Sequence, residues 1–189
     1  AYDSRRFPLS KETAKQQELV VCTTAGLPAK SLETFLETAA ACPNHKFVLA
    51  VATCTGHFDL IGRCVDLNRQ LGEPVEIRVD VPHAEAAALL RHASIYMCTQ
   101  RAVKRGMPIA VAEALASGCH LVVPNLPWLE DMIGSHGVTY KDAAEAATLI
   151  QDTRTWTADK WQQVSADASS FASLTYSDES VLPRVVAVW

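Results

Sequence analysis

The sequence predicts an α/β fold with a doubly wound parallel sheet of about six strands. Short apolar runs rich in Val and Ile alternate with helical patterns over most of the 189 residues. Such alternation favours parallel strands joined by helices on both faces, because the crossovers are nearly always right-handed. Consecutive apolar residues are typical of strands buried between two helical layers. The expected strands are 19–24, 46–54, 75–81, 94–99, 120–124 and 137–140, in the order 3-2-1-4-5-6.

Helices are expected between and after these strands. Apolar residues recur at helical spacing in 32–40, 86–93 and 144–150. The strands stop after Tyr140, and two further helices are expected over 142–153 and 157–172, with Asp142 and Thr157 as N-caps.

The chain divides into one domain and two end segments. Residues 1–15 are polar and irregular and are expected to be a linker, residues 16–174 form the domain, and residues 175–189 form a C-terminal segment. The last segment carries apolar residues up to the final position. We therefore expect both ends to be boundaries of a fragment.

Composition excludes several function classes. A net charge of −4 and a pI near 5.9 leave no broad positive surface, so nucleic acid is not an expected partner. No apolar run approaches the ~20 residues of a membrane span. The six cysteines include no CxxC pair, which favours buried, reduced thiols of a cytosolic protein over metal ligands or disulfides.

The stretch 101–118 carries the strongest chemical signal. It follows a strand, so it lies at the carboxyl edge of the sheet, where ligands bind. Gly106 allows close backbone approach, Pro108 suits the first position of a helix, and Gly118 would end that helix. A helix N-terminus attracts anions. Three basic residues lie just upstream of it: Arg101, Lys104 and Arg105. The pattern predicts a phosphate cradle, with a solvated basic loop as the alternative.

Glu113 is the one charged residue between Pro108 and Gly118. A carboxylate in so apolar a helix costs several kcal/mol if it is buried without partners. It must therefore be exposed on a thin solvent-facing stripe, paired, or bound to a ligand.

Two motifs lie in this stretch: Gly106-Met107-Pro108 and, after it, Glu113-Ala114-Leu115-Ala116-Ser117-Gly118. Together they resemble the signature of the family 4, or group 1, glycosyltransferases. Further matches follow in order over nearly the whole chain. Residues 2–7 resemble the family's interdomain linker, Lys30 occupies the place of a lysine after the first strand, and 89–93 and 129–137 resemble later segments.

The resemblance implies a GT-B architecture, in which two Rossmann-like domains face each other, and a retaining mechanism. This chain would be the C-terminal, donor-binding half. The whole enzyme would transfer a hexose from a nucleoside diphosphate sugar to a glycan or lipid-linked acceptor in polysaccharide biosynthesis. The N-terminal acceptor domain would be absent, so the isolated fragment would be inactive. The enzyme would be cytoplasmic, reaching the inner membrane surface through its missing part, and residues 175–189 would cross back to the other domain.

The resemblance also implies a set of donor-binding residues. Glu113 would bind the ribose hydroxyls and Lys30 would neutralise the diphosphate. The backbone at Gly106 and the amides of Met107, Ile109 and Ala110 would face phosphate or sugar, and Glu130 follows the fifth strand near the donor. No catalytic residue is assigned. No cofactor or metal is expected, since the sequence has no Asp-x-Asp motif.

The sequence departs from the family pattern at several positions. Arg105 replaces the first glutamate of the family's pair, Ala25 replaces an arginine, Ser31 replaces a glycine, and Thr99-Gln100 replaces a Pro-Ser. Under one interpretation Arg105 supplies the missing phosphate cation, or pairs with an acidic donor sugar, through its planar fork of donors. Under the other, the domain is a degenerate, non-catalytic copy.

Functions of other classes remain open at this stage. An NAD-type domain is disfavoured because the first strand leads into Thr23-Thr24-Ala25-Gly26 without a GxGxxG fingerprint. A phosphotransfer receiver would need an acidic pocket near that strand. A non-catalytic nucleotide-binding or interaction module, and a sugar-nucleotide epimerase-like domain, remain as alternatives.

Overall fold

The computed structural model describes residues 2–7, 14–101 and 108–186 of the chain. Its centre is a six-stranded sheet in the order β3-β2-β1-β4-β5-β6, and every pairing is parallel. The strands are β1 (Gln16–Ala25), β2 (Lys46–Ala52), β3 (Val75–Val79), β4 (Ala93–Met97), β5 (His120–Pro124) and β6 (Gly137–Tyr140). The predicted fold class and strand order are therefore confirmed.

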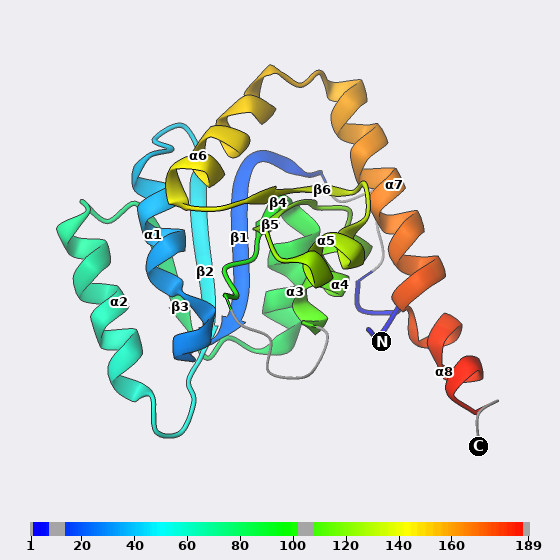
Figure 1. Ribbon diagram of the computed structural model, residues 1–189, viewed down its shortest axis with the longest axis horizontal. Helices are drawn as coiled ribbons and strands as arrows, with labels where there is room; N and C mark the ends of the chain where they lie inside the picture. Colours follow the sequence, from blue (N-terminus) through cyan, green and yellow to red (C-terminus); the bar gives the residue numbers. More distant parts are fainter. Residues whose placement is uncertain (1, 8–13, 102–107, 187–189) are drawn as a thin grey trace.

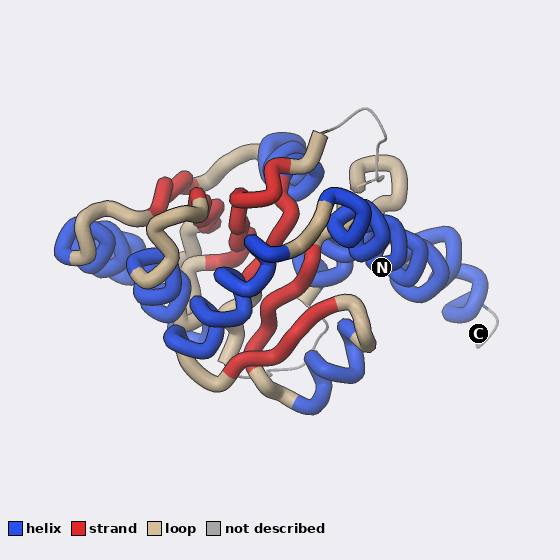
Figure 2. Tube along the Cα trace, turned by 90° about the horizontal axis from the view of Figure 1, so that it is seen from above, coloured by secondary structure: helices blue, strands red, loops and turns tan. Residues whose placement is uncertain are grey.

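Helices cover both faces of the sheet (Figure 1 and Figure 2). One face packs against α1 (Leu32–Ala40), α2 (Phe58–Gln70) and α6 (Ala143–Asp152). The other packs against α3 (His83–His92), α4 (Ile109–Ala116), α5 (Pro127–Ile133) and the second half of α7 (Ala158–Tyr176). Two 3-10 turns, η1 (Pro28–Lys30) and η2 (Thr153–Thr155), and the last helix, α8 (Asp178–Val186), complete the elements. Within the described ranges, no helix has the length and apolarity to cross a bilayer.

Strands β2 and β3 end earlier than the sequence predicts, at Ala52 and Val79. The reason is a turn at Asp80, whose backbone is left-handed with φ 51°. Its carboxylate accepts hydrogen bonds from the Thr53 amide, at 2.7 Å, and from the Thr53 hydroxyl. The turn directs the segments that follow β2 and β3 out of the sheet at its carboxyl edge.

The late helices begin at the predicted caps. The side chain of Asp142 accepts a hydrogen bond from the Glu145 amide at 2.9 Å, and Thr157 accepts one from the Lys160 amide at 3.3 Å. α7 continues to Tyr176, beyond the predicted 157–172. The extension is held by Tyr176, whose hydroxyl donates to the Met132 carbonyl at 2.8 Å and whose ring packs edge-on against Phe171 with centroids 5.8 Å apart.

The N-terminal segment, residues 2–7, lies against the junction of α7 and α8. Tyr2 forms a parallel bridge with Ser177, its amide donates to the Tyr176 carbonyl at 3.0 Å, and its carbonyl accepts from Asp178. Phe7, at the other end of the segment, is buried in the core beneath α3 and α4. This segment is thereby fixed to the domain at both ends.

All six cysteines are free, as the sequence predicts. Five are buried, and Cys54 is half-buried. Burial raises the pKa of the Cys64 thiol to about 11 and also raises that of Cys22, Cys98 and Cys119. These thiols are therefore protonated and unreactive at neutral pH.

Candidate functional site

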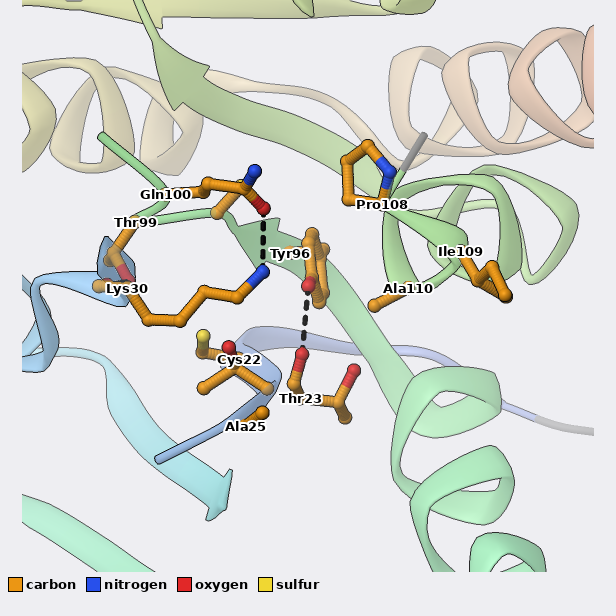
Figure 3. Close-up of a pocket in the computed structure, with 12 residues that line it drawn as sticks. Cys22, Thr23, Ala25, Lys30, Tyr96, Thr99, Gln100, Pro108, Ile109 and Ala110 are labelled. Atoms are coloured by element: carbon orange, nitrogen blue, oxygen red, sulfur yellow. Dashed lines mark hydrogen bonds between the residues drawn. The ribbon is translucent and has the colours of Figure 1, made fainter. Parts of the chain in front are cut away.

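A cavity of about 160 Å³ opens at the carboxyl edge of the sheet, between β1 and β4. The chain turns in opposite directions from these two neighbouring strands, so the cavity lies at the switch point of the fold, the usual ligand position in doubly wound sheets. It is lined by Cys22, Thr23, Thr24, Ala25, Lys30, Tyr96, Cys98, Thr99, Gln100, Pro108, Ile109 and Ala110 (Figure 3).

Lys30 extends along one wall of this cavity. It ends η1, and its Nζ donates to Oε1 of Gln100 at 2.5 Å (Figure 3). The turn is joined to the chain after β4 by two more hydrogen bonds: the Thr99 hydroxyl donates to the Lys30 carbonyl, and the Arg101 amide donates to the Ala29 carbonyl at 3.0 Å. The position of the ammonium group is thus set by both β1 and β4.

Tyr96 forms the floor. Its hydroxyl donates to the Thr23 carbonyl at 3.1 Å, and burial raises its pKa well above the ordinary value. The ring therefore stays neutral. The Thr23 hydroxyl beside it is buried without a hydrogen-bond partner among the described residues. A ligand group in the cavity can supply one.

The start of α4 forms the opposite wall, and Ile109 and Ala110 lie on the far side of Tyr96 from Lys30 (Figure 3). The first N–H groups of a helix lack intrahelical acceptors and carry partial positive charge. The prediction that Pro108 occupies the first helical position is wrong: Pro108 is the N-cap, with extended backbone, and Ile109 begins the helix. The cavity therefore lies between one lysine cation and one helix N-terminus.

The end of α4 matches the sequence prediction for Gly118. This residue has φ 74°, in the left-handed region that glycine adopts without strain. Its amide donates to the Leu115 carbonyl at 2.8 Å, and the Cys119 amide donates to the Ala114 carbonyl at 3.0 Å. This pair of bonds is a Schellman motif. It fixes where α4 ends and so its register against the cavity.

Glu113 lies one turn along α4 from Ala110, and it is not among the residues that line the cavity. Its side chain is 13% exposed, and burial raises the pKa of the carboxyl group. His83 Nε2 lies 3.3 Å from Oε1, and this contact opposes the shift. Of the three states that the sequence allows for this carboxylate, the structure shows the paired one.

One of the other predicted residues lies away from the cavity. Glu130 is exposed on α5 and is not among the residues that line the cavity. Arg105, Gly106 and Met107 lie outside the described residues.

The structure also adds residues that sequence reasoning missed. Gln100, Tyr96 and Thr23 line the cavity, and His83 contacts Glu113. The sequence feature that could have identified these residues is their position at or just after the carboxyl ends of β1, β3 and β4. Polar residues at those ends meet at one edge of a parallel sheet.

Comparison with known proteins agrees with this geometry. The sequence model of a family described as glycosyl transferases group 1 matches residues 18–155, which include β1 from Glu18 onward, all of β2 to β6 and the whole cavity. No curated protein matches the sequence significantly.

Solved structures share the fold at low sequence identity. HepE from Anabaena, crystallised with UDP and glucose, has a TM-score of 0.84 and 14% identity over 100% of this chain and 55% of its own. Sucrose-phosphate synthase from Thermosynechococcus elongatus has a TM-score of 0.81 and 14% identity, covering 99% of this chain and 50% of that one.

A third structure matches along its entire length. The C-terminal domain of the group 1 glycosyl transferase LpcC from Francisella tularensis has a TM-score of 0.75 and 16% identity, covering 94% of this chain and 100% of that one. This chain thus spans about half of the Anabaena and Thermosynechococcus proteins and corresponds in size to the Francisella domain. Because the family's sequence model covers most of the chain, from 18 to 155, the protein belongs to the glycosyl transferases group 1.

Proposed function

We propose that this domain binds the nucleoside diphosphate of a sugar donor, and that the enzyme transfers the sugar to a glycan or lipid-linked acceptor. The observation that carries the proposal is the cavity at the switch point, where Lys30 and the N-terminus of α4 face each other. Both groups favour negative charge. A diphosphate is the leaving group that such a pair would stabilise.

Charge supports a phosphate ligand over a neutral one. The hydrogen-bond partner of Lys30 is the neutral amide of Gln100, at 2.5 Å. Within the described ranges, no carboxylate lies within ion-pair distance of its Nζ. The ammonium charge is therefore available to a ligand. Glu113 lies on the same helix as the anion site, and a carboxylate accepts the hydrogen bonds that a ribose diol donates.

The size of the cavity supports a site that a second surface completes. Its volume of about 160 Å³ is below the roughly 300–1,000 Å³ of pockets that enclose a small molecule. The chain also covers 55% of HepE. We propose that the acceptor is held by a further domain facing this edge, and, from the family resemblance, that transfer retains the anomeric configuration.

Thermal unfolding of the chain with UDP, GDP, ADP, their sugar conjugates and NAD tests the donor proposal. A ligand at ~100 times its Kd adds roughly 2.7 kcal/mol to the free energy of unfolding. That gain raises the Tm of a domain of this size by roughly 5–10 °C. We expect such a shift with one nucleoside diphosphate, lost in Glu113→Ala. A shift with NAD alone, or none with any nucleoside diphosphate, contradicts donor binding by this chain.

Replacing Lys30 by methionine is expected to weaken binding of the nucleoside diphosphate about 10- to 30-fold, the value of a charge-assisted contact. Binding of the corresponding nucleoside, without phosphates, is expected to stay unchanged. Isothermal titration calorimetry measures both. Lys46→Met is the matched control, because Lys46 begins β2 at the opposite edge and pairs with Glu76 at 3.5 Å. Equal losses for nucleoside and diphosphate would show that Lys30 does not contact phosphate.

A further inference from the structure

One imidazole ring connects Glu113 to the N-terminal segment, residues 2–7. His83, the first residue of α3, has Nε2 3.3 Å from Oε1 of Glu113 and Nδ1 2.9 Å from Nη1 of Arg6. The three side chains come from α4, α3 and the N-terminal segment. They form a continuous path from the segment to the Glu113 carboxylate on α4.

The direction of the hydrogen bonds follows from the chemistry of the groups. A guanidinium group has donors and no acceptor, so Nδ1 of His83 must accept from Arg6. A neutral ring that accepts at Nδ1 carries its proton on Nε2. That N–H is then directed at the Glu113 carboxylate. Arg6 therefore acts together with the acceptor carboxylate of Glu113 to favour the tautomer that carries its proton on Nε2.

Other contacts hold the ring and its guanidinium partner in place. Phe7, which is 1% exposed, packs edge-to-face on the His83 ring with centroids 5.5 Å apart. The Arg6 carbonyl accepts from Nη1 of Arg91 at 2.9 Å, and its guanidinium pairs with Asp3 at 3.2 Å. The His83 side chain itself is half-exposed, with 50% of its surface accessible. Its orientation therefore depends on these neighbours more than on burial.

We propose that His83 is a positioning residue for Glu113, and that Arg6 tunes nucleotide affinity by fixing the His83 tautomer. The proposal rests on the proposed function, in which Glu113 accepts hydrogen bonds from a ribose. The Nε2–H group of His83 holds one carboxylate oxygen, Oε1, in a single orientation. The second oxygen, Oε2, is thereby set for the ligand before it binds. Segment 2–7, through Arg6, becomes part of the donor site without touching the donor.

Calorimetric titration of the whole chain with UDP tests this role. His83→Phe keeps a ring for Phe7 to pack on but removes the donor, and it is expected to weaken UDP binding about tenfold. His83→Gln keeps an N–H donor and is expected to stay within about threefold of the wild type. Arg6→Met is expected to weaken binding by about threefold, because the ring then divides its proton between two nitrogens. His92→Phe, at the exposed far end of α3, is the control and should not change affinity.

A double-mutant cycle separates positioning from a general structural role. If His83 acts through Glu113, His83→Phe adds no further loss in the Glu113→Ala background. Full additivity of the two losses, or a His83→Gln variant as weak as His83→Phe, would overturn the proposal.

Two NMR measurements test the connection from Arg6 through His83 to Glu113 in the absence of a ligand. Long-range ¹H–¹⁵N spectra are expected to show His83 protonated on Nε2 in the wild type and a mixture of tautomers in Arg6→Met. Carboxyl ¹³C titration is expected to show a higher Glu113 pKa in His83→Phe, since the His83 contact lowers it. An Nδ1-protonated ring or an unchanged Glu113 pKa would refute the linkage. A wild type that binds no nucleotide, with both NMR results as expected, would refute the proposed function instead.

Discussion

Gly137→Ala is expected to destabilise the protein by about 3 kcal/mol, as overpacking in a rigid site does. Gly137 begins β6 and pairs with Leu121 of β5. A Cβ atom there would lie 2.6 Å from the Leu121 carbonyl oxygen and 2.7 Å from its Cβ. Both atoms are fixed by the sheet, so relief requires β6 to move away from β5 and to weaken its ladder. The Tm is expected to fall by roughly 6–12 °C.

Gly62→Ala is the matched control for this experiment. Gly62 lies inside α2, and a Cβ added there has no neighbour within 4 Å. Alanine favours a helix over glycine by about 1 kcal/mol, so this variant should be as stable as the wild type or more so. Urea melts followed by circular dichroism compare the two. A Gly137→Ala protein within 0.5 kcal/mol of the wild type, a margin of about the usual error, would show that the close approach of β5 and β6 is wrong.

Acidification from pH 7 to pH 4 is expected to remove about 3 kcal/mol of stability through His120 alone. This residue begins β5, is 6% exposed, and lies with its ring 4.8 Å from that of Trp156. Burial, with the nearby charge of Lys160, lowers its pKa from 6.5 to about 4. The folded state therefore binds fewer protons than the unfolded state in this interval. Stability is complete above pH 6.5 and falls as the pH approaches 4, at about 1.4 kcal/mol per pH unit.

His120→Phe isolates this contribution. The variant has its own packing cost, but that cost does not depend on pH, so the slope of unfolding free energy against pH is the quantity to compare. Urea melts at pH 7, 6, 5 and 4 are expected to give a flatter profile for His120→Phe than for the wild type. Some slope remains, because burial and Arg154 also lower the pKa of His45. An identical slope in both proteins would contradict a buried, neutral His120. His92→Phe, on the surface, should leave the profile unchanged.

The fold was predictable because its signals are local. Apolar runs such as 120–124 and 137–140 coincide with β5 and β6 to the residue, and the polar caps Asp142 and Thr157 begin their helices. Errors arose where a long-range contact ends an element. The Asp80 turn held by Thr53 ends β2 and β3, and the hydrogen bond from Tyr176 to Met132 lengthens α7. Neither contact has a signature within its own stretch of sequence.

The site was predictable only in part, for a related reason. Lys30, Ile109 and Ala110 do line the cavity, but their position came from the family resemblance and from a helix start that sequence patterns mark. Gln100 reaches Lys30 across 70 positions of sequence, and Arg6 reaches His83 across 77. Partners at such distances depend on how strands and segments align in the folded chain. A single sequence gives no information on that alignment.

The strand order also determines which parts of the sheet can form first during synthesis and which parts can unfold locally. β1, β2 and β3 can assemble with α1 and α2 as soon as residue 79 has been made, whereas β4 must wait for residues 93–97. The boundary between β1 and β4 therefore separates a half of the sheet that is synthesised early from a half that is synthesised late. Such halves are expected to unfold locally as separate cooperative units. The cavity lies on that boundary and is lined from both halves. A molecule bound there would join the two halves, so it would protect backbone amides far from itself against exchange with solvent.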